Sequence, residues 1–152
     1  MAVVERKAVR AIILDEAGRV LLVRFDRKDV GKAWWAAVGG GLDEGESEEE
    51  ALRREIFEET GISEFAIGPR LWQRQTRFEW KGRNYLQEDR FWLVQVEAFE
   101  PLPKWANDEE RDLVGEVRWW TVEEMEASTE VMSPFDLPAL VRELLQGEVG
   151  LA

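Results

Sequence analysis

The chain has 152 residues, of which 45% are hydrophobic and 34% charged, and its formal net charge at pH 7 is −12. These values are typical of a single globular domain with a full core, and the negative charge disfavours a surface that binds the phosphate backbone of nucleic acid. Because the sequence contains neither cysteine nor histidine, disulfides, thiolate nucleophiles, serine–histidine triads and histidine- or cysteine-based zinc sites are excluded.

Proton and metal chemistry must therefore rely on Asp and Glu, with Lys, Arg or Tyr in supporting roles. No apolar run is long enough to cross a bilayer. Glu5, Arg6, Lys7 and Arg10 interrupt the apolar residues at the N-terminus, which does not have the arrangement of a signal peptide. We expect one domain over residues 1–152, in the cytoplasm and without a membrane partner.

The first third of the chain predicts two strands. Apolar, β-rich runs cover residues 9–14 and 20–25, and the turn signal at 15–18 favours a hairpin between them. Residues 25–32 are predicted to form a charged loop. Residues 34–38 then lead toward a run of glycines.

Gly39, Gly40 and Gly41 give the backbone freedom to turn tightly and to approach a ligand closely. A glycine triplet alone is more often an ordinary loop. Directly ahead of an acidic helix, however, it favours a ligand-binding loop, and we expect these three residues to contribute to binding.

The next segment predicts a helix over residues 48–60. Ser47 and Glu50 form a capping box, which satisfies backbone donors at the start of a helix. The residues that follow are good helix formers, and Gly61 supplies a left-handed stop. Leu52 and Ile56 are expected to face a sheet.

The helix carries acids on one face. At about 100° per residue, Glu55, Glu58 and Glu59 fall within an arc of roughly 100°, with the small Ala51 one turn earlier leaving room for a ligand. Like charges at this spacing repel one another, and the cluster becomes favourable mainly when a cation lies among them. Oxygen-only ligands select hard ions, which indicates Mg2+ or Mn2+.

Two plainer interpretations compete with a metal site. The acids are also compatible with a solvated helix face. Arg54, four residues before Glu58, is placed to orient that carboxylate, but the same spacing produces ordinary surface ion pairs.

Residues 40–62 fit the pattern G-x5-E-x7-R-E-U-x-E-E-x-G-U, where U is aliphatic, and the chain thereby resembles the Nudix hydrolase family. The positions that fit are Gly40, Glu46, Arg54, Glu55, Ile56, Glu58, Glu59, Gly61 and Ile62. The resemblance implies an α/β fold in which a mixed β-sheet is sandwiched between helices, an α/β/α arrangement.

The resemblance also implies roles. Glu55, Glu58 and Glu59 match the metal-binding acids of the family, and Glu46 matches a supporting one. A further acid usually comes from a downstream loop, for which the candidates are Glu109, Glu110 and Asp112. We select Glu110, although a solvated charge run explains this loop as well.

The second half predicts long strands over 70–80 and 85–99, joined by a turn at 81–84. A short strand at 117–120 precedes a helix capped by Thr121 and Glu124. A last helix covers 136–146. The element order is neither doubly wound nor all-β.

Aromatic and basic residues suggest how a substrate is held. Trp34, Trp80 and Trp105 lie at or near predicted loop ends, where a base can stack. The candidates for contact with phosphates are Arg24, Arg27, Lys28, Arg77 and Arg90.

The resemblance implies a metal-dependent pyrophosphohydrolase, in which water attacks phosphorus in a diphosphate that joins a nucleoside to another group. A nucleotide-sensing module without turnover is one alternative, but such a module is expected to lose acids that this chain retains. An isomerase of isoprenoid diphosphates is another, and it is expected to use cysteine, which is absent. The long hairpin over 70–99 also predicts a homodimer, because its apolar edge is larger than a small monomer usually exposes.

Overall fold

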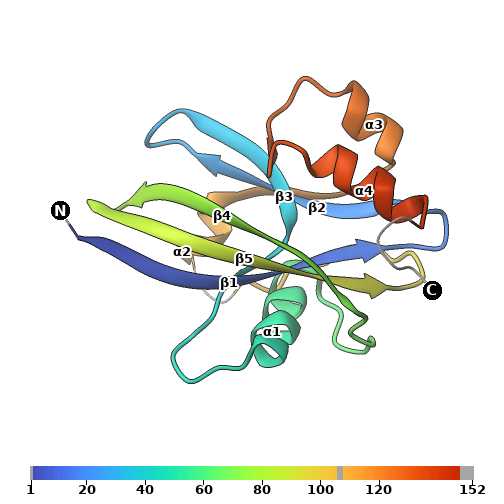
Figure 1. The fold of residues 1–152 in the computed structure, drawn as a ribbon, viewed down its shortest axis with the longest axis horizontal. Helices are drawn as coiled ribbons and strands as arrows, with labels where there is room; N and C mark the ends of the chain where they lie inside the picture. The colour runs from blue at the N-terminus through green and yellow to red at the C-terminus, as the bar shows by residue number, and fades with distance from the viewer. Residues whose placement is uncertain (1, 106–107, 148–152) are drawn as a thin grey trace.

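A mixed sheet lies between two helical layers in the computed structural model, which describes residues 2–105 and 108–147; the side chains of 108–110 lie outside this description. Helix α1 covers one face, and α3 and α4 cover the other (Figure 1). In chain order the elements are β1 (Val3–Leu14), β2 (Val20–Arg27), β3 (Lys32–Gly41), α1 (Glu48–Thr60), β4 (Arg70–Trp80), β5 (Arg83–Gln95), α2 (Asp108–Leu113), β6 (Val114–Trp120), α3 (Val122–Ala127), β7 (Met132–Ser133) and α4 (Leu137–Leu145). The predicted α/β/α sandwich is confirmed.

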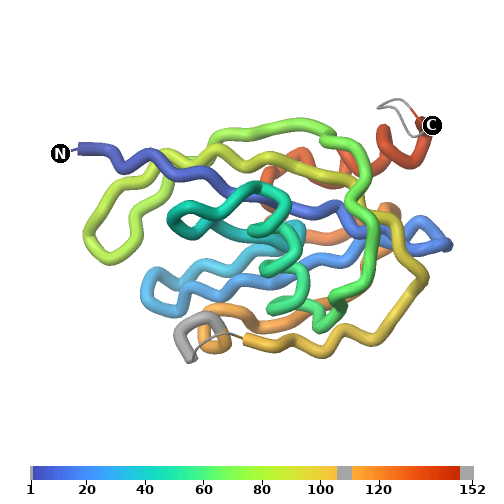
Figure 2. The backbone as a smooth tube through the Cα atoms, turned by 90° about the horizontal axis from the view of Figure 1, so that it is seen from below, coloured from blue at the N-terminus to red at the C-terminus, as the bar shows by residue number. Residues whose placement is uncertain are grey.

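The strand pairings bring distant parts of the chain together. β1 pairs in parallel with β5 along its whole length and antiparallel with β3 between Ala8–Ala11 and Val38–Gly41. β2 pairs with β3 and with β6, and β4 pairs with β5 as a long hairpin. The end of β3 therefore lies beside the middle of β1, directly under α1, which crosses the strands in Figure 2.

Each face of the sheet has its own core. On the α1 face, Leu52 and Ile56 are fully buried, as predicted. Ala51 is buried in the same core, so it packs against the sheet and leaves no room for a ligand, contrary to the prediction. On the other face, Trp35 and Trp120 meet edge to face, with ring centroids 4.9 Å apart, beneath α3 and α4.

The local helix signals operate as predicted. α1 covers the predicted residues, the capping box of Ser47 and Glu50 is formed, and Gly61 ends the helix with φ 86°. The second capping box, Thr121 with Glu124, starts α3 in the same way.

Some boundaries differ from the predictions. β2 continues to Arg27, so only residues 28–31 of the predicted charged loop connect the strands. Gly39, Gly40 and Gly41 lie inside β3 and not in a loop, because β1 supplies strand partners for them. A short helix, α2, stands where a loop with acids was predicted at 107–112. Among the described residues, no helix combines the length and the apolar character needed to cross a membrane.

Candidate active site

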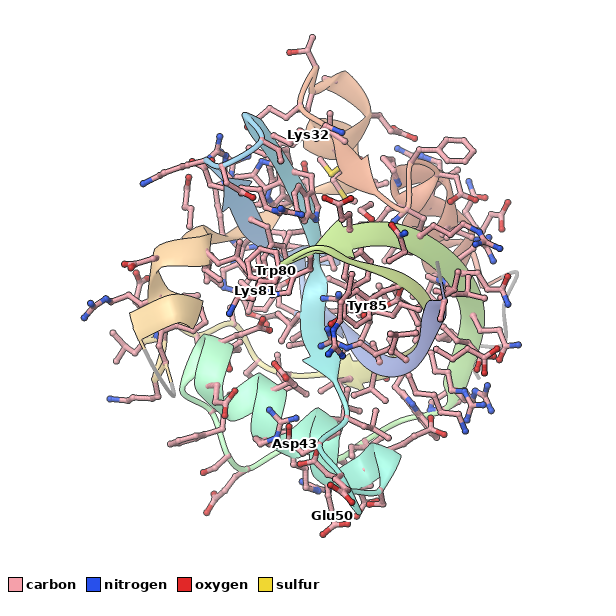
Figure 3. All side chains as sticks on the ribbon, turned by 90° about the vertical axis from the view of Figure 1, so that its left-hand side faces the viewer. Lys32, Asp43, Glu50, Trp80, Lys81 and Tyr85 are labelled. Atoms are coloured by element: carbon pink, nitrogen blue, oxygen red, sulfur yellow. The ribbon has the colours of Figure 1, made fainter. Side chains whose placement is uncertain are left out.

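A cavity of about 490 Å³ opens between α1 and the β2–β3 and β4–β5 hairpins. Figure 3 looks onto this end of the molecule, with Lys32 and Lys81 next to the two hairpin turns and Glu50 near the start of α1. The predicted residues that line the cavity are Gly39, Gly40, Gly41, Glu55, Glu58, Glu59, Trp34, Trp80, Trp105 and Arg27. The cavity therefore joins the acidic face of α1 to an aromatic region.

The glycines allow β3 and α1 to approach each other. Gly39 has φ 152°, and a Cβ there would collide with the carbonyl oxygen of Val9. A Cβ on Gly40 would lie 2.6 Å from Oε1 of Glu55, closer than atoms pack. These residues are glycines because a protein strand and a carboxylate occupy the space that side chains would need.

Arg54 contacts several of the predicted acids at once. Its Nε and Nη2 donate to Glu46, at 2.8 and 2.9 Å, and Nη2 also donates to the carbonyl of Gly41 at 3.0 Å. Its Nη1 lies 2.9 Å from Glu55 and 3.4 Å from Glu58. The contact with Glu58 predicted from the spacing is present, but it is the longest of the set. Arg54 is thus an internal counter-ion for these three carboxylates and not an ordinary surface ion pair, and its Nε also lies 3.3 Å from the exposed Asp43.

Glu59 is held differently. Its Oε2 accepts a hydrogen bond from the backbone N–H of Gly39 at 2.8 Å, and the residue is only 4% exposed.

The hydrogen bond between Arg54 and Glu46 lowers the pKa of Glu46. The same hydrogen bond, together with the contacts of Arg54 with Glu55, raises the pKa of Arg54. Both groups therefore stay charged at neutral pH.

The donors of this site fit a hard cation in their chemistry. They are carboxylate oxygens only, and the missing side chain of Gly40 allows the Glu55 carboxylate to lie against β3. Among the described residues, however, no three acids converge on a single point. Arg54 and the N–H of Gly39 hold the carboxylates toward protein donors, so an ion would have to displace these contacts.

The other end of the cavity is aromatic and basic. Phe25 and Trp34 are stacked, with ring centroids 5.7 Å apart, and the guanidinium of Arg27 lies 4.6 Å from the ring centroid of Trp80. Of the cations selected from the sequence, Arg27 is the one that lines the cavity, whereas Arg24, Lys28, Arg77 and Arg90 do not. The basic residues that sequence reasoning missed are Arg6, Arg10 and Arg74.

Polar residues on the cavity floor were missed as well. Thr76, Gln87 and Asp89 project into it from β4 and β5. A signal was present, because alternation along the strand places Gln87 and Asp89 on the same face as Phe91 and Leu93, which are core residues. The side chains of Glu109 and Glu110 lie outside the described residues, so the selection of Glu110 stays a prediction.

Comparisons with known proteins show which proteins this chain is similar to. The isopentenyl-diphosphate Delta-isomerase of Halobacterium salinarum is 32% identical over 127 residues, covering 80% of this chain and 57% of that protein. The RNA pyrophosphohydrolase of Shewanella piezotolerans is 31% identical over 105 residues, covering 62% and 58%. This chain thus spans less than two thirds of the length of either relative.

Solved structures support the fold. The MutT protein of Methanosarcina mazei superposes with a TM-score of 0.66 at 23% identity, covering 97% of this chain and 98% of that one. A family model, described as the NUDIX domain, matches residues 4–144. The protein described here therefore belongs to the NUDIX domain family.

Proposed function

We propose that the protein is a metal-dependent hydrolase that cleaves a diphosphate bond in a nucleotide or nucleotide derivative by attack of water on phosphorus. The observation that carries the proposal is a cavity that joins Glu55, Glu58 and Glu59 of α1 to an aromatic, basic region. Arg54, which pairs with Glu46, contacts Glu55 and Glu58 from outside the cavity lining. Relatives named for hydrolysis of such bonds support the proposal.

The acids would hold the cation. Glu55, Glu58 and Glu59 are the proposed ligands of Mg2+ or Mn2+, with Glu46 supporting them and Arg54 orienting the set. A divalent cation there would neutralise charge on phosphate oxygens and make a nearby water more acidic. A carboxylate of α1, or Glu110, accepts the proton that water loses.

The far end of the cavity would hold the rest of the substrate. Trp34 and Trp80 offer flat faces for a base, and Arg27 and Arg74 offer positive charge for phosphates. The net charge of −12 favours a small nucleotide over a nucleic acid, because the local arginines counter the field only near the cavity.

The relative named as an isomerase makes isomerisation of an isoprenoid diphosphate the second candidate. It is disfavoured because the sequence has no cysteine for that chemistry. An isomerase would leave the diphosphate of its substrate intact, whereas the proposed hydrolase cleaves it.

The deciding experiment is a substrate panel with Mg2+ or Mn2+, containing nucleoside triphosphates, oxidised deoxynucleoside triphosphates, ADP-ribose, dinucleoside polyphosphates and isopentenyl diphosphate. The proposal expects metal-dependent cleavage of at least one nucleotide, with oxygen from 18O-labelled water entering a phosphate product. Binding of nucleotides without cleavage would favour a sensing module, and rearrangement of isopentenyl diphosphate would favour the isomerase.

Gly40→Ala tests the close approach of β3 to α1. The new Cβ would force the Glu55 carboxylate to move, because it would lie 2.6 Å from Oε1 and 2.9 Å from Cδ. Displacement of a reacting group by about 1 Å costs on the order of a hundredfold, and we expect turnover to fall by that amount. Steady-state kinetics measure it. Gly115→Ala is the control, because its Cβ would lie 3.2 Å from the flexible end of Arg24 and at an ordinary 3.9 Å from the Arg24 carbonyl oxygen. Equal activity in both variants would show that Glu55 is not needed where it lies.

We also propose that the protein forms a homodimer through the β4–β5 hairpin. β4 is the terminal strand of the sheet, so its outer edge is available for another chain. Light scattering at micromolar concentration is expected to report twice the mass of the 17.6 kDa chain. A mass equal to one chain would contradict the dimer and leave the proposed reaction untouched.

A further inference from the structure

Asp89 lines the cavity, and each of its two carboxylate oxygens accepts at least one hydrogen bond. Oδ1 accepts from Nε of Arg10 at 3.1 Å and from the amide of Gln87 at 2.9 Å. Oδ2 accepts from the hydroxyl of Thr76 at 3.2 Å. The residue is 6% exposed, so these three donors fix its orientation.

Arg10 continues this network toward the acids. Its Nη1 donates to the carbonyl oxygens of Ala37 and Gly39, at 3.2 and 3.1 Å. The N–H of the same Gly39 donates to Glu59 at 2.8 Å. Hydrogen bonds therefore link Asp89 on β5, through the Arg10 side chain on β1 and the backbone of Gly39 on β3, to a proposed metal ligand on α1.

Arg10 also carries charge close to the site. Burial opposes that charge most strongly, but Asp89, Glu59 and Glu55 together outweigh burial and raise the pKa of Arg10. A permanent cation beside carboxylates competes with a divalent ion for the same oxygens. The arginine therefore assists the site only while it is kept from pairing fully with Glu55 and Glu59.

We propose that Asp89 is a positioning residue that holds Arg10 against the carbonyls of β3. In this position Arg10 supports the Gly39 backbone that orients Glu59, and its own guanidinium does not compete with a metal ion for the acids of α1. This role rests on the proposed function, because it assigns the acids to a cation. It adds a residue outside the helix to the set that controls metal affinity.

Asp89→Asn tests the role without substrate. Asparagine keeps the shape but removes the charge that restrains Arg10, which then pairs with Glu55 and Glu59. The expected result is Mn2+ affinity weakened by about tenfold or more, the scale seen when a group that orients a metal ligand is lost. Titration of Mn2+ followed by electron paramagnetic resonance of the free ion measures this directly.

The double variant Asp89→Asn/Arg10→Met separates competition from simple damage. Removing both members of a buried pair is better tolerated than removing one. If Arg10 released from Asp89 blocks the acids, the double variant binds Mn2+ more tightly than Asp89→Asn alone. Affinity as weak as, or weaker than, that of the single variant would overturn the proposal.

Asp15→Asn is the matched control. Asp15 is 7% exposed and paired with Arg19 at 2.7 Å, so the change removes a similar buried ion pair away from the cavity. It is expected to lower the unfolding temperature and to leave Mn2+ affinity unchanged. Equal weakening in Asp15→Asn and Asp89→Asn would reduce the effect to general destabilisation and overturn the proposal.

Gln87→Leu keeps the test decisive if Asp89→Asn does not fold. It removes one neutral donor to Asp89 and retains the ion pair, so Mn2+ affinity is expected to weaken about threefold, the scale of one hydrogen bond. A Mn2+ affinity equal to that of the wild type would overturn the positioning role of Asp89 and leave the proposed function untouched. A wild-type protein that binds no Mn2+ would overturn the metal-dependent function as well.

Discussion

Glu58→Gln and Glu59→Gln are each expected to lower turnover by at least about two to three powers of ten, the scale seen when one preorganised electrostatic group is lost. Glutamine keeps the shape of the side chain but removes the charge that a hard cation requires. The folded protein should lose little stability without metal, because the change also relieves repulsion among Glu55, Glu58 and Glu59. Steady-state kinetics at saturating Mn2+ and urea unfolding measure the two effects.

Glu49→Gln is the control for these variants. Glu49 lies on the same helix, but its side chain is 71% exposed, and its one ion pair within the described part of the chain is with Arg53, at 3.8 Å. Its turnover is expected to stay within a few-fold of the wild type. If Glu58→Gln and Glu49→Gln behave alike, the acids of α1 are a solvated surface and the proposed function is wrong.

The parts of the fold that the sequence predicts well are those that depend on neighbouring residues. Helix α1 begins and ends as expected because Ser47, Glu50 and Gly61 act within a few residues of the ends they control. The acids of α1 share a face for the same reason, since helical geometry alone places Glu55 near Glu59. The spacing of these acids along the chain is therefore sufficient to identify the acidic half of the site.

The other half depends on strand pairing. Arg10 and Asp89 are 79 residues apart in the chain and meet because β1 and β5 pair in parallel. No local pattern specifies that register. The sequence marks Arg10 only as a charge among the apolar residues of 8–14, and Asp89 only as one of several polar residues in its strand. The same pairing places Gly39 inside β3, where a glycine triplet alone suggests a loop.

Packing decides a third class of positions. Ala51 lies on the helix face expected to leave space for a ligand, yet the sheet fills that space and buries it completely. Helical periodicity gives the direction of a side chain but not the distance to the neighbouring layer. Small residues near an acidic face are therefore weak predictors of a cavity.

Arg54→Met is expected to destabilise the metal-free protein by about 1–3 kcal/mol. Removing one partner of a buried ion pair costs roughly 3–5 kcal/mol, and the value is reduced here because the Arg54 side chain is 25% exposed. Methionine keeps much of the aliphatic length but leaves Glu46, Glu55 and Glu58 without their common counter-ion. Urea unfolding in the presence of a chelator measures the loss.

A cation should compensate for the missing guanidinium. Saturating Mn2+ is expected to stabilise Arg54→Met more than the wild type, because binding to the folded state shifts unfolding by mass action and the variant has more uncompensated charge to gain from it. Turnover should still fall, since Glu58 and Glu46 lose the donor that orients them.

Arg53→Met is the matched control, because Arg53 is on the same helix but is 43% exposed, and its one ion pair within the described residues is with the exposed Glu49. Arg53 also contacts Phe65, through a 3.3 Å hydrogen bond to its carbonyl and a cation–π contact of 5.1 Å with its ring. It is expected to change stability by less than about 1 kcal/mol, the usual limit for an exposed ion pair, and to respond to Mn2+ as the wild type does. Equal stability of the two arginine variants in chelator would contradict the role of Arg54 as an internal counter-ion. A selective gain from Mn2+ in Arg54→Met would mean that the arginine and the metal ion neutralise the same carboxylates, one in the resting protein and the other in the active one.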